Sequence, residues 1–123
     1  MKAYLDESQP IFQQIAQMIV DEIVEGHIKE EEKIPSENEL SSFYNINRAT
    51  VRNGLQSLVE AEIIYKQRGI GMFVKMGARA KLLAERQNQY RSNYILPLLN
   101  EAKRLGMSVE EVIEIIKEED ERK

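Results

Sequence analysis

A chain of 123 residues, of which 31% are charged and 42% hydrophobic, is long enough for one small globular domain with an appendage. It contains no cysteine, which excludes disulfides, thiolate metal sites and thiol nucleophiles. No apolar run approaches the roughly 20 residues of a membrane span, and the opening MKAYLDESQP lacks the apolar core of a signal peptide. We therefore expect a complete cytoplasmic protein without membrane contact.

The formal net charge of −4 by itself disfavours nucleic acid as a partner, because phosphate binding depends on lysine and arginine. The charge is unevenly distributed, however. Residues 1–42 carry three basic and ten acidic residues, residues 43–77 carry five basic and two acidic residues, and residues 78–123 carry nine of each. A basic region therefore lies in the middle of an otherwise acidic or neutral chain.

The first predicted helix lies in SQPIFQQIAQMIVDEIVEG. Its apolar residues recur every three or four positions, as in an amphipathic helix: Phe12, Ile15, Ala16, Ile19 and Ile23. We expect Ser8 to cap its start, with Pro10 in the first turn. Gly26 should end it, because glycine adopts the left-handed conformation with little steric cost.

Two further helices are predicted, separated by a short turn. In PSENEL, Ser36 and Glu39 have the spacing of a capping box, which marks a helix start. Asn47 is a good N-cap for a third helix that begins at Arg48 and ends near residue 61. The inner stripe of this third helix is Val51, Leu55, Leu58 and Val59. Its outer stripe is Arg48, Arg52 and Gln56, with Asn53 beside them. Two helices joined by a tight turn, the second with arginines and amides facing outward, make a helix-turn-helix.

The segment IIYKQRGIGMFVK contains two short runs of β-branched and aromatic residues around a loop with Gly69 and Gly71, which predicts a β-hairpin. Its tip carries Gln67 and Arg68. A hairpin directly after such a helix is the wing of a winged-helix domain. The RGIG loop could instead cradle a nucleotide phosphate, but it lacks the strand-to-helix context of a dinucleotide fold, so the hairpin is favoured.

The chain beyond residue 77 is predicted to be helical. One helical face collects apolar residues and is interrupted by Pro97, where we expect a kink: Leu83, Tyr90, Tyr94, Leu98, Ala102 and Leu105. Ser108 should cap a last helix, whose apolar face is Val109, Val112, Ile113 and Ile116. Two helices could hardly bury these stripes on each other alone, so a second copy of the chain is the simplest partner. The expected dimerisation residues are Leu83, Tyr90, Tyr94, Leu98, Val112 and Ile116.

The expected fold class is mainly α (α+β). Residues 1–76 should form an N-terminal winged helix-turn-helix with a small β-hairpin wing, and residues 77–123 a two-helix C-terminal dimerisation tail.

The stretch IPSENELSSFYNINRATVRNGLQSLVEAEIIYKQRGIGMFV resembles the winged helix of the GntR family of bacterial transcription regulators. The pattern of that family runs LPSE, VSR.TVR.AL, GLI and G.GTFV, and the resemblance extends from near Phe12 to Val74. The short tail is similar to the YtrA-type branch, whose C-terminal part mediates dimerisation and lacks a large effector-binding domain. The resemblance implies DNA contact by Ser36, Arg48, Thr50 and Arg52, with the Gly69–Gly71 wing tip in the minor groove.

Five positions depart from the family pattern. Asn38 stands where many members have a base-reading arginine, which alters one expected major-groove contact. Glu62 replaces the usual glycine before the LI pair, and two glutamates at residues 30–31 replace a common Pro-Gly. Gly54 replaces the usual alanine inside the third helix, at a cost of about 1 kcal/mol in helix propensity.

The candidate DNA-contacting residues lie in the helix-turn-helix and the wing: Ser36, Asn38, Asn47, Arg48, Thr50, Arg52, Asn53, Gln67, Arg68, Gly69 and Gly71. An arginine near the start of such a third helix can donate two bonds to guanine, but which of Arg48 and Arg52 reads a base is open. Both could alternatively be solvated and pair with glutamates of the acidic first helix. Ser36 is also explained as a helix cap and Thr50 by its place in a first turn, although a hydroxyl at a helix start suits phosphate oxygens.

These observations predict a dimeric, sequence-specific repressor that binds double-stranded operator DNA. The alternative is a winged-helix module for protein–protein interaction, which would not need the basic region. No catalytic set or metal cluster stands out, and His27 is the only histidine, so we expect neither an enzyme nor a metal or other cofactor. A small-molecule effector, if one exists, would need a pocket between subunits or between tail and winged helix. Tyr90 and Tyr94 could line a crevice between subunits.

Overall fold

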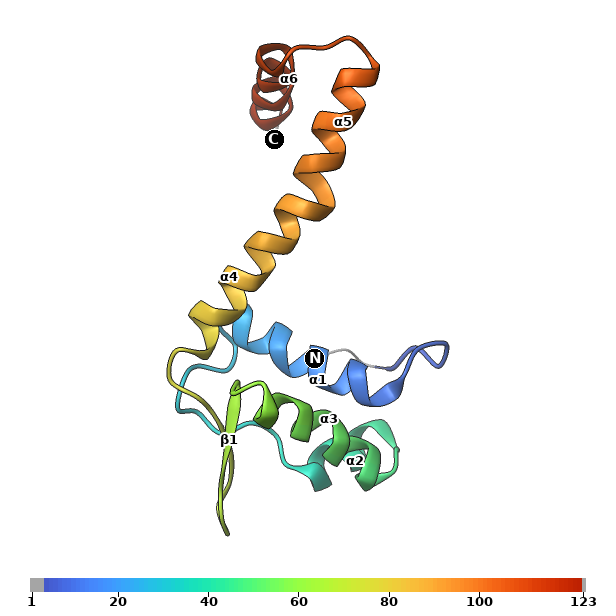
Figure 1. Cartoon of the computed structure of the whole chain (residues 1–123). Coiled ribbons are helices and arrows are strands. Elements are labelled where there is room, and N and C mark those ends of the chain that lie inside the picture. The colour runs from blue at the N-terminus through green and yellow to red at the C-terminus, as the bar shows by residue number, and fades with distance from the viewer. Residues whose placement is uncertain (1–3, 123) are drawn as a thin grey trace. The chain divides into compact units, whose positions relative to one another are not determined.

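The computed structural model describes residues 4–122 and divides into two compact units, residues 1–83 and residues 84–123. The first unit contains three helices, then a two-stranded antiparallel hairpin, then the start of a fourth helix (Figure 1). Its elements are α1 (Ile11–Val24), α2 (Glu37–Tyr44), α3 (Arg48–Glu60), β1 (Ile64–Gln67), β2 (Gly71–Val74) and the first turns of α4 (Ala78–Tyr90). This is the predicted mainly helical winged helix-turn-helix.

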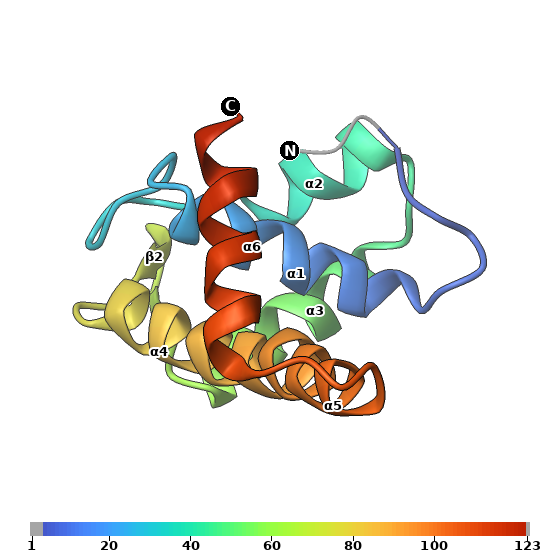
Figure 2. The same ribbon diagram turned by 90° about the horizontal axis from the view of Figure 1, so that it is seen from above.

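The core of the first unit lies between α1 and α3, which pack side by side (Figures 1 and 2). Its fully buried members include five residues of the predicted inner stripes of α1 and α3 and three residues of neighbouring elements: Ile15, Ile19, Ile23, Val51 and Leu55, with Leu40, Ile64 and Val74. Phe12, also predicted on the apolar stripe of α1, is instead 38% exposed. The two helices lie close together at Gly54. A Cβ atom added there would lie 2.6 Å from the Phe12 carbonyl oxygen and 3.2 Å from Ile15 Cβ. The glycine that departs from the family pattern therefore sits where α1 leaves no room for a side chain.

The predicted caps that define the helix-turn-helix are confirmed. The Ser36 hydroxyl accepts a hydrogen bond from the Glu39 amide at 3.1 Å, and Glu39 Oε1 accepts one from the Ser36 amide at 3.0 Å. Asn47 Oδ1 accepts a hydrogen bond from the Ala49 amide at 2.7 Å at the start of α3. These bonds satisfy amide groups that a helix start leaves without partners, and they fix the directions of both helices.

The expected cap of α1 is wrong. Pro10 occupies the N-cap position, and the amide and hydroxyl of Ser8 donate instead to Asp6 Oδ1, at 2.9 and 2.7 Å. The segment before α1 is held by Gln14, whose buried side chain accepts from the Asp6 amide at 2.8 Å and donates to the Gln9 carbonyl at 3.1 Å. Because Gln14 fixes this segment against the helix, the chain enters α1 without a side-chain cap.

The hairpin is anchored at its base by a third extended segment. β1 and β2 pair in register from Ile64 opposite Val74 to Gln67 opposite Gly71. Residues 31–34 run beside β2: the Ile34 amide donates to the Met72 carbonyl at 2.9 Å, and Lys33 forms a bridge with Phe73. The base of the wing is therefore fixed to the chain that leads into α2, whereas only its tip projects.

Two of the departures from the family pattern have left-handed backbones. Glu31 has φ 69° and Glu62 has φ 61°, and both stand where the pattern has glycine. A non-glycine residue in this conformation costs about 1–2 kcal/mol, because its Cβ crowds the following carbonyl oxygen. The two positions are therefore strained in this chain.

We expect Glu62→Gly to stabilise the first unit by about 0.5–1 kcal/mol, since relief of the left-handed strain exceeds the entropic penalty of glycine. The ion pair lost with Lys75, 3.2 Å away and exposed, contributes little. Urea unfolding measures the change. Glu60→Gly, in the last turn of α3, is the matched control and should destabilise by a similar amount. A Glu62→Gly protein no more stable than the parent would contradict the strain argument.

The first unit extends beyond the expected boundary at residue 76. Ala78 and Leu82, in the first turns of α4, belong to its buried core. Leu83, assigned to dimerisation, is half-buried at the end of this unit. The winged helix therefore needs the start of the following helix to close its core.

In the second unit α4 leads through the π-helical segment η1 (Arg91–Ile95) into α5 (Leu96–Arg104). Pro97 is the second residue after η1. A proline ring clashes with the carbonyl four residues earlier, here that of Asn93, and the wider π turn relieves such a clash. The sequence predicted a kink at this proline, and what the structure has is a π-helical segment on its N-terminal side.

The last helix, α6 (Val109–Glu121), packs on α5 and lies at an angle to it (Figure 2). Ser108 and Glu111 form the capping box that starts it. Ala102 of α5 and Val112 of α6 are the buried residues among the described part of this unit. Val112 is only 8% exposed, so it supports the packing of α6 and offers no surface to a second chain. The other dimerisation candidates of this unit are exposed: Tyr90, Tyr94, Leu98 and Ile116. No helix within residues 4–122 is long and apolar enough to cross a membrane.

Candidate nucleic-acid interface

A hollow of about 490 Å³ opens between the start of α2, the outer side of α3 and the hairpin. Its polar lining comes from all three elements and from the segment before α2: Lys33, Ser36, Glu37, Asn38, Arg48, Arg52 and Lys66. We call this surface the recognition hollow. Four of these side chains are basic and one is acidic, so the hollow is cationic although the chain as a whole is acidic. A cationic surface beside a projecting helix suits a polyanion.

The two arginines of α3 face outward, as predicted. Arg48 and Arg52 lie one turn apart, and their side chains are 58% and 59% exposed. Val51 and Leu55, on the opposite side of α3, are buried in the core and fix the rotation of the helix. The guanidinium groups are therefore presented to solvent by a helix that cannot turn them inward.

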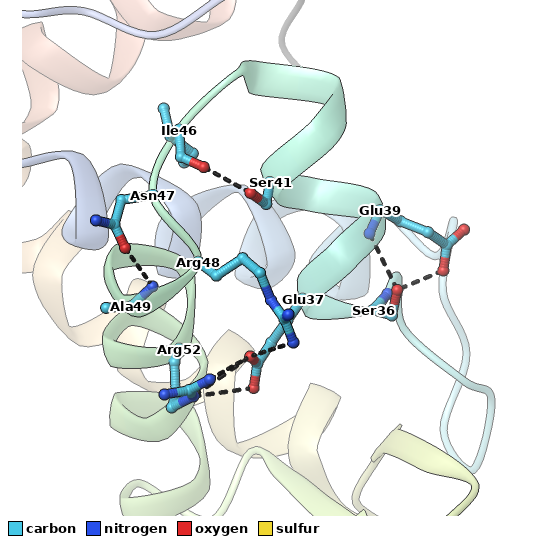
Figure 3. Close-up of polar contacts among 9 residues, drawn as sticks. All are labelled: Ser36, Glu37, Glu39, Ser41, Ile46, Asn47, Arg48, Ala49 and Arg52. Atoms are coloured by element: carbon cyan, nitrogen blue, oxygen red, sulfur yellow. Dashed lines mark hydrogen bonds and ion pairs between the residues drawn. The ribbon is translucent and has the colours of Figure 1, made fainter.

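Glu37 of α2 holds both guanidinium groups (Figure 3). Its Oε1 atom lies 3.3 Å from Arg52 Nε, 3.2 Å from Arg52 Nη2 and 4.0 Å from Arg48 Nη2. The alternative prediction placed the acidic partner on the first helix, but the structure places it on α2. Exposed ion pairs of this kind contribute about 0–1 kcal/mol, so phosphate or base groups can displace the carboxylate. In the unbound protein the Glu37 carboxylate keeps the two arginines side by side.

The hydroxyl and amide candidates near the helix starts have structural roles. Ser36 caps α2, and its hydrogen bonds to Glu39 lower the pKa of that carboxyl below its usual value. The Ser36 hydroxyl still has its proton to donate to a phosphate oxygen. Asn47 commits its side-chain oxygen to the cap of α3. Thr50 is half-buried in the first turn of that helix.

The wing tip carries the remaining candidates. Gln67, Arg68 and Gly69 are exposed, and the Ile70 amide closes the turn by donating to the Gln67 carbonyl at 3.0 Å. Gly69 has φ 79°, a conformation that favours glycine. Gly71 is half-buried at the start of β2.

Three residues of the recognition hollow were not singled out from the sequence: Lys33, Glu37 and Lys66. Lys33 lies outside the basic region of the sequence and reaches the hollow only because its segment pairs with β2. Its side chain crosses Gly71, where an added Cβ would lie 2.5 Å from Lys33 Cε. Lys66 belongs to the basic region of the sequence, but no role was predicted for it. Glu37 is visible in the sequence only as part of PSEN.

The single histidine of the sequence lies near two glutamates. His27 Nδ1 lies 3.2 Å from Glu22 Oε2 and 3.5 Å from Glu25 Oε2, on the surface beyond α1. In the described part of the chain, no group of three or more histidine, aspartate or glutamate residues could hold a metal ion.

The fold and this surface define a winged helix-turn-helix protein. Residues 11–74 match the family described as "Bacterial regulatory proteins, gntR family". The chain belongs to this family, and the predicted resemblance is confirmed.

Curated relatives match about half of the chain. The HTH-type transcriptional regulator YurK of Bacillus subtilis is 43% identical over 68 residues, which are 55% of this chain and 28% of that protein. The mannosyl-D-glycerate transport/metabolism system repressor MngR of Escherichia coli is 36% identical over 67 residues, 54% of this chain and 28% of that protein. This chain thus matches little more than a quarter of the length of these relatives, which are regulators and not enzymes.

Solved structures extend the similarity to the tail. A transcriptional regulator of the GntR family from Bacteroides thetaiotaomicron superposes with a TM-score of 0.73 at 33% identity, over 91% of this chain and 97% of that chain. AraR(DBD), solved in complex with operator ORE1, superposes with a TM-score of 0.52 at 32% identity, over 60% of this chain and 93% of that chain. The similarity to AraR is to a domain captured on DNA.

Proposed function

We propose that this chain is a sequence-specific transcriptional repressor that binds an inverted-repeat operator as a homodimer. In each protomer α3 enters the major groove, and the wing tip lies against the adjacent minor groove. Arg48 and Arg52 contact base edges and phosphates, and Ser36, Thr50 and Arg68 contact the backbone. The observation that carries the proposal is the outward, exposed pair of arginines on a helix locked by its buried face.

The electrostatics of the first unit support a nucleic acid rather than a protein partner. The recognition hollow gathers four basic side chains from three separate segments, and Glu37 is its one acidic member. A surface for protein docking has no need of such a concentration of positive charge. Arginine is also the side chain that guanine O6 and N7 bind in bidentate geometry. The related AraR structure with operator DNA supports the same assignment.

The second unit supports dimerisation. α5 and α6 bury little on each other, and many apolar side chains of this unit are exposed: Tyr90, Tyr94, Leu96, Leu98, Leu105, Val109, Ile113, Ile115 and Ile116. So many exposed apolar residues in one small unit require a partner surface. A twofold dimer would present two copies of α3 to half-sites about 34 Å apart, one turn of the duplex. An effector pocket, if regulation uses one, would have to form between subunits.

Repression is inferred from the relatives, since MngR is named a repressor. A dimer that covers two half-sites also excludes other proteins from that stretch of DNA. Cytoplasmic location follows from this role, because the operator lies in the cytoplasm of a bacterial cell.

Selection of binding sites from random duplexes by the full chain tests the proposal. We expect an enriched inverted repeat, bound by two chains as measured by sedimentation, with affinity that falls steeply as salt rises. Failure to enrich any sequence would reject the proposed function and favour the protein-interaction alternative. Enrichment of a single half-site bound by one chain would reject the dimer alone.

A further inference from the structure

Among the residues that the structure describes, Asn38 is the one carboxamide that lines the recognition hollow. It is the second residue of α2 and is exposed. Its neighbours around the hollow include Arg48 and Arg52 on α3 and Glu37 on its own helix. The amide therefore lies on the same surface as the guanidinium groups of Arg48 and Arg52, which contact base edges in the proposed function.

The side chain of Asn38 is available for a ligand. Among residues 4–122 it makes no intramolecular hydrogen bond, whereas Asn47 spends its side-chain oxygen on the cap of α3. Asn53 and Gln67, the other amides among the DNA-contact candidates, do not line the hollow. An asparagine with both its oxygen and its NH₂ group free can accept one hydrogen bond and donate another in parallel.

We propose that Asn38 reads an adenine in the major groove of each half-site, so that the recognition surface combines arginine contacts to guanine with one amide contact to adenine. The inference rests on the proposed function. In this contact Asn38 Oδ1 accepts a hydrogen bond from adenine N6, and Nδ2 donates one to adenine N7, which is the bidentate pattern that distinguishes adenine from the other bases.

The charge distribution favours a base over a phosphate for this residue. The carboxylate of Glu37 is next to Asn38 in the chain and on the same surface, and it repels a phosphate oxygen placed between them. Lys33 and Lys66, on the wing side of the hollow, carry full charges and are the better phosphate ligands. A neutral adenine edge meets no such repulsion and uses both halves of the amide.

Parallel site selections with the parent chain, Asn38→Ala and Asn38→Arg test this inference, with Asn88→Ala, an exposed asparagine of α4 outside the winged helix-turn-helix, as the matched control. The parent and the control should enrich the same site, with adenine at one position of each half-site. Asn38→Ala should lose the preference at that position alone and bind the selected duplex about 5- to 150-fold more weakly. Asn38→Arg should change the preference there to guanine.

A duplex with 7-deazaadenine at that position, which lacks N7, gives a second measurement. It should weaken the parent about 2- to 10-fold and leave Asn38→Ala unaffected. A parent that enriches an operator which Asn38→Ala binds with the same sequence preference and affinity would overturn the inference and leave the proposed function standing. A parent that enriches no sequence would overturn both.

Discussion

Replacing both Arg48 and Arg52 by alanine is expected to abolish sequence-specific binding, with a loss of affinity on the order of 10²-fold or more. Each bidentate arginine–guanine contact discriminates by about 1–3 kcal/mol, and an arginine on a phosphate adds electrostatic attraction. The two residues share Glu37 as a partner, at 3.2 Å from Arg52 and 4.0 Å from Arg48. Removing both leaves that carboxylate unpaired on a surface that must approach phosphates, which weakens binding further.

Fluorescence anisotropy with the selected duplex, at one fixed salt concentration, measures this loss. Arg104→Ala is the matched control, since Arg104 is an exposed arginine paired with Glu101 at 3.1 Å in the second unit. It should bind as the parent does. Because the replaced side chains are exposed, all the variants should unfold within about 0.5 kcal/mol of the parent. A folded double variant with parental affinity would remove α3 from the DNA interface.

A triple variant that also carries Glu37→Gln separates charge from recognition. Neutralising the carboxylate should recover part of the affinity for random DNA, because the repulsion of phosphates is gone. It should recover none of the discrimination between the operator and random DNA, because no arginine remains to contact a base. Recovered discrimination would show that Arg48 and Arg52 serve only as positive charge.

The features that could be predicted from the sequence are those that depend on near neighbours in the chain. The caps by Ser36, Asn47 and Ser108 join residues two or three positions apart, so a short pattern defines them. The outward direction of Arg48 and Arg52 follows from the period of the buried residues on the same helix. Local physics therefore accounts for the helix-turn-helix and for one side of the recognition hollow.

The features that were missed need contacts between distant segments. Glu37 and Arg52 are 15 positions apart and meet only when α2 packs on α3. Lys33 joins the recognition hollow because its segment pairs with β2, a pairing that leaves no periodic signal in so short a stretch. Gln14 is polar, so nothing in the sequence indicated a buried position for it, although its buried amide replaces the expected cap of α1. In each case the partner is set by tertiary packing.

Gly54→Ala is expected to destabilise the first unit by about 1–2 kcal/mol, although alanine is the better helix former by about 1 kcal/mol. The reason is the closeness of α1: the added Cβ would lie 2.6 Å from the Phe12 carbonyl oxygen, a backbone atom that cannot move without shifting the helix. Thermal unfolding should show a fall of about 4–8 °C per kcal/mol for a domain of this size. Substitution of a larger residue such as valine should be worse.

Asn53→Ala, one position earlier on the exposed side of α3, is the control for helix propensity alone and should leave stability unchanged or raise it slightly. Shortening Ile15 to valine in the Gly54→Ala background should not restore stability, because the nearest obstacle is the backbone of α1 and not the Ile15 side chain at 3.2 Å. A Gly54→Ala protein as stable as the parent would mean that α1 and α3 can separate at little cost. The family pattern, with alanine at this position, would then fit the present helix spacing, and the departure to glycine would have no packing cause.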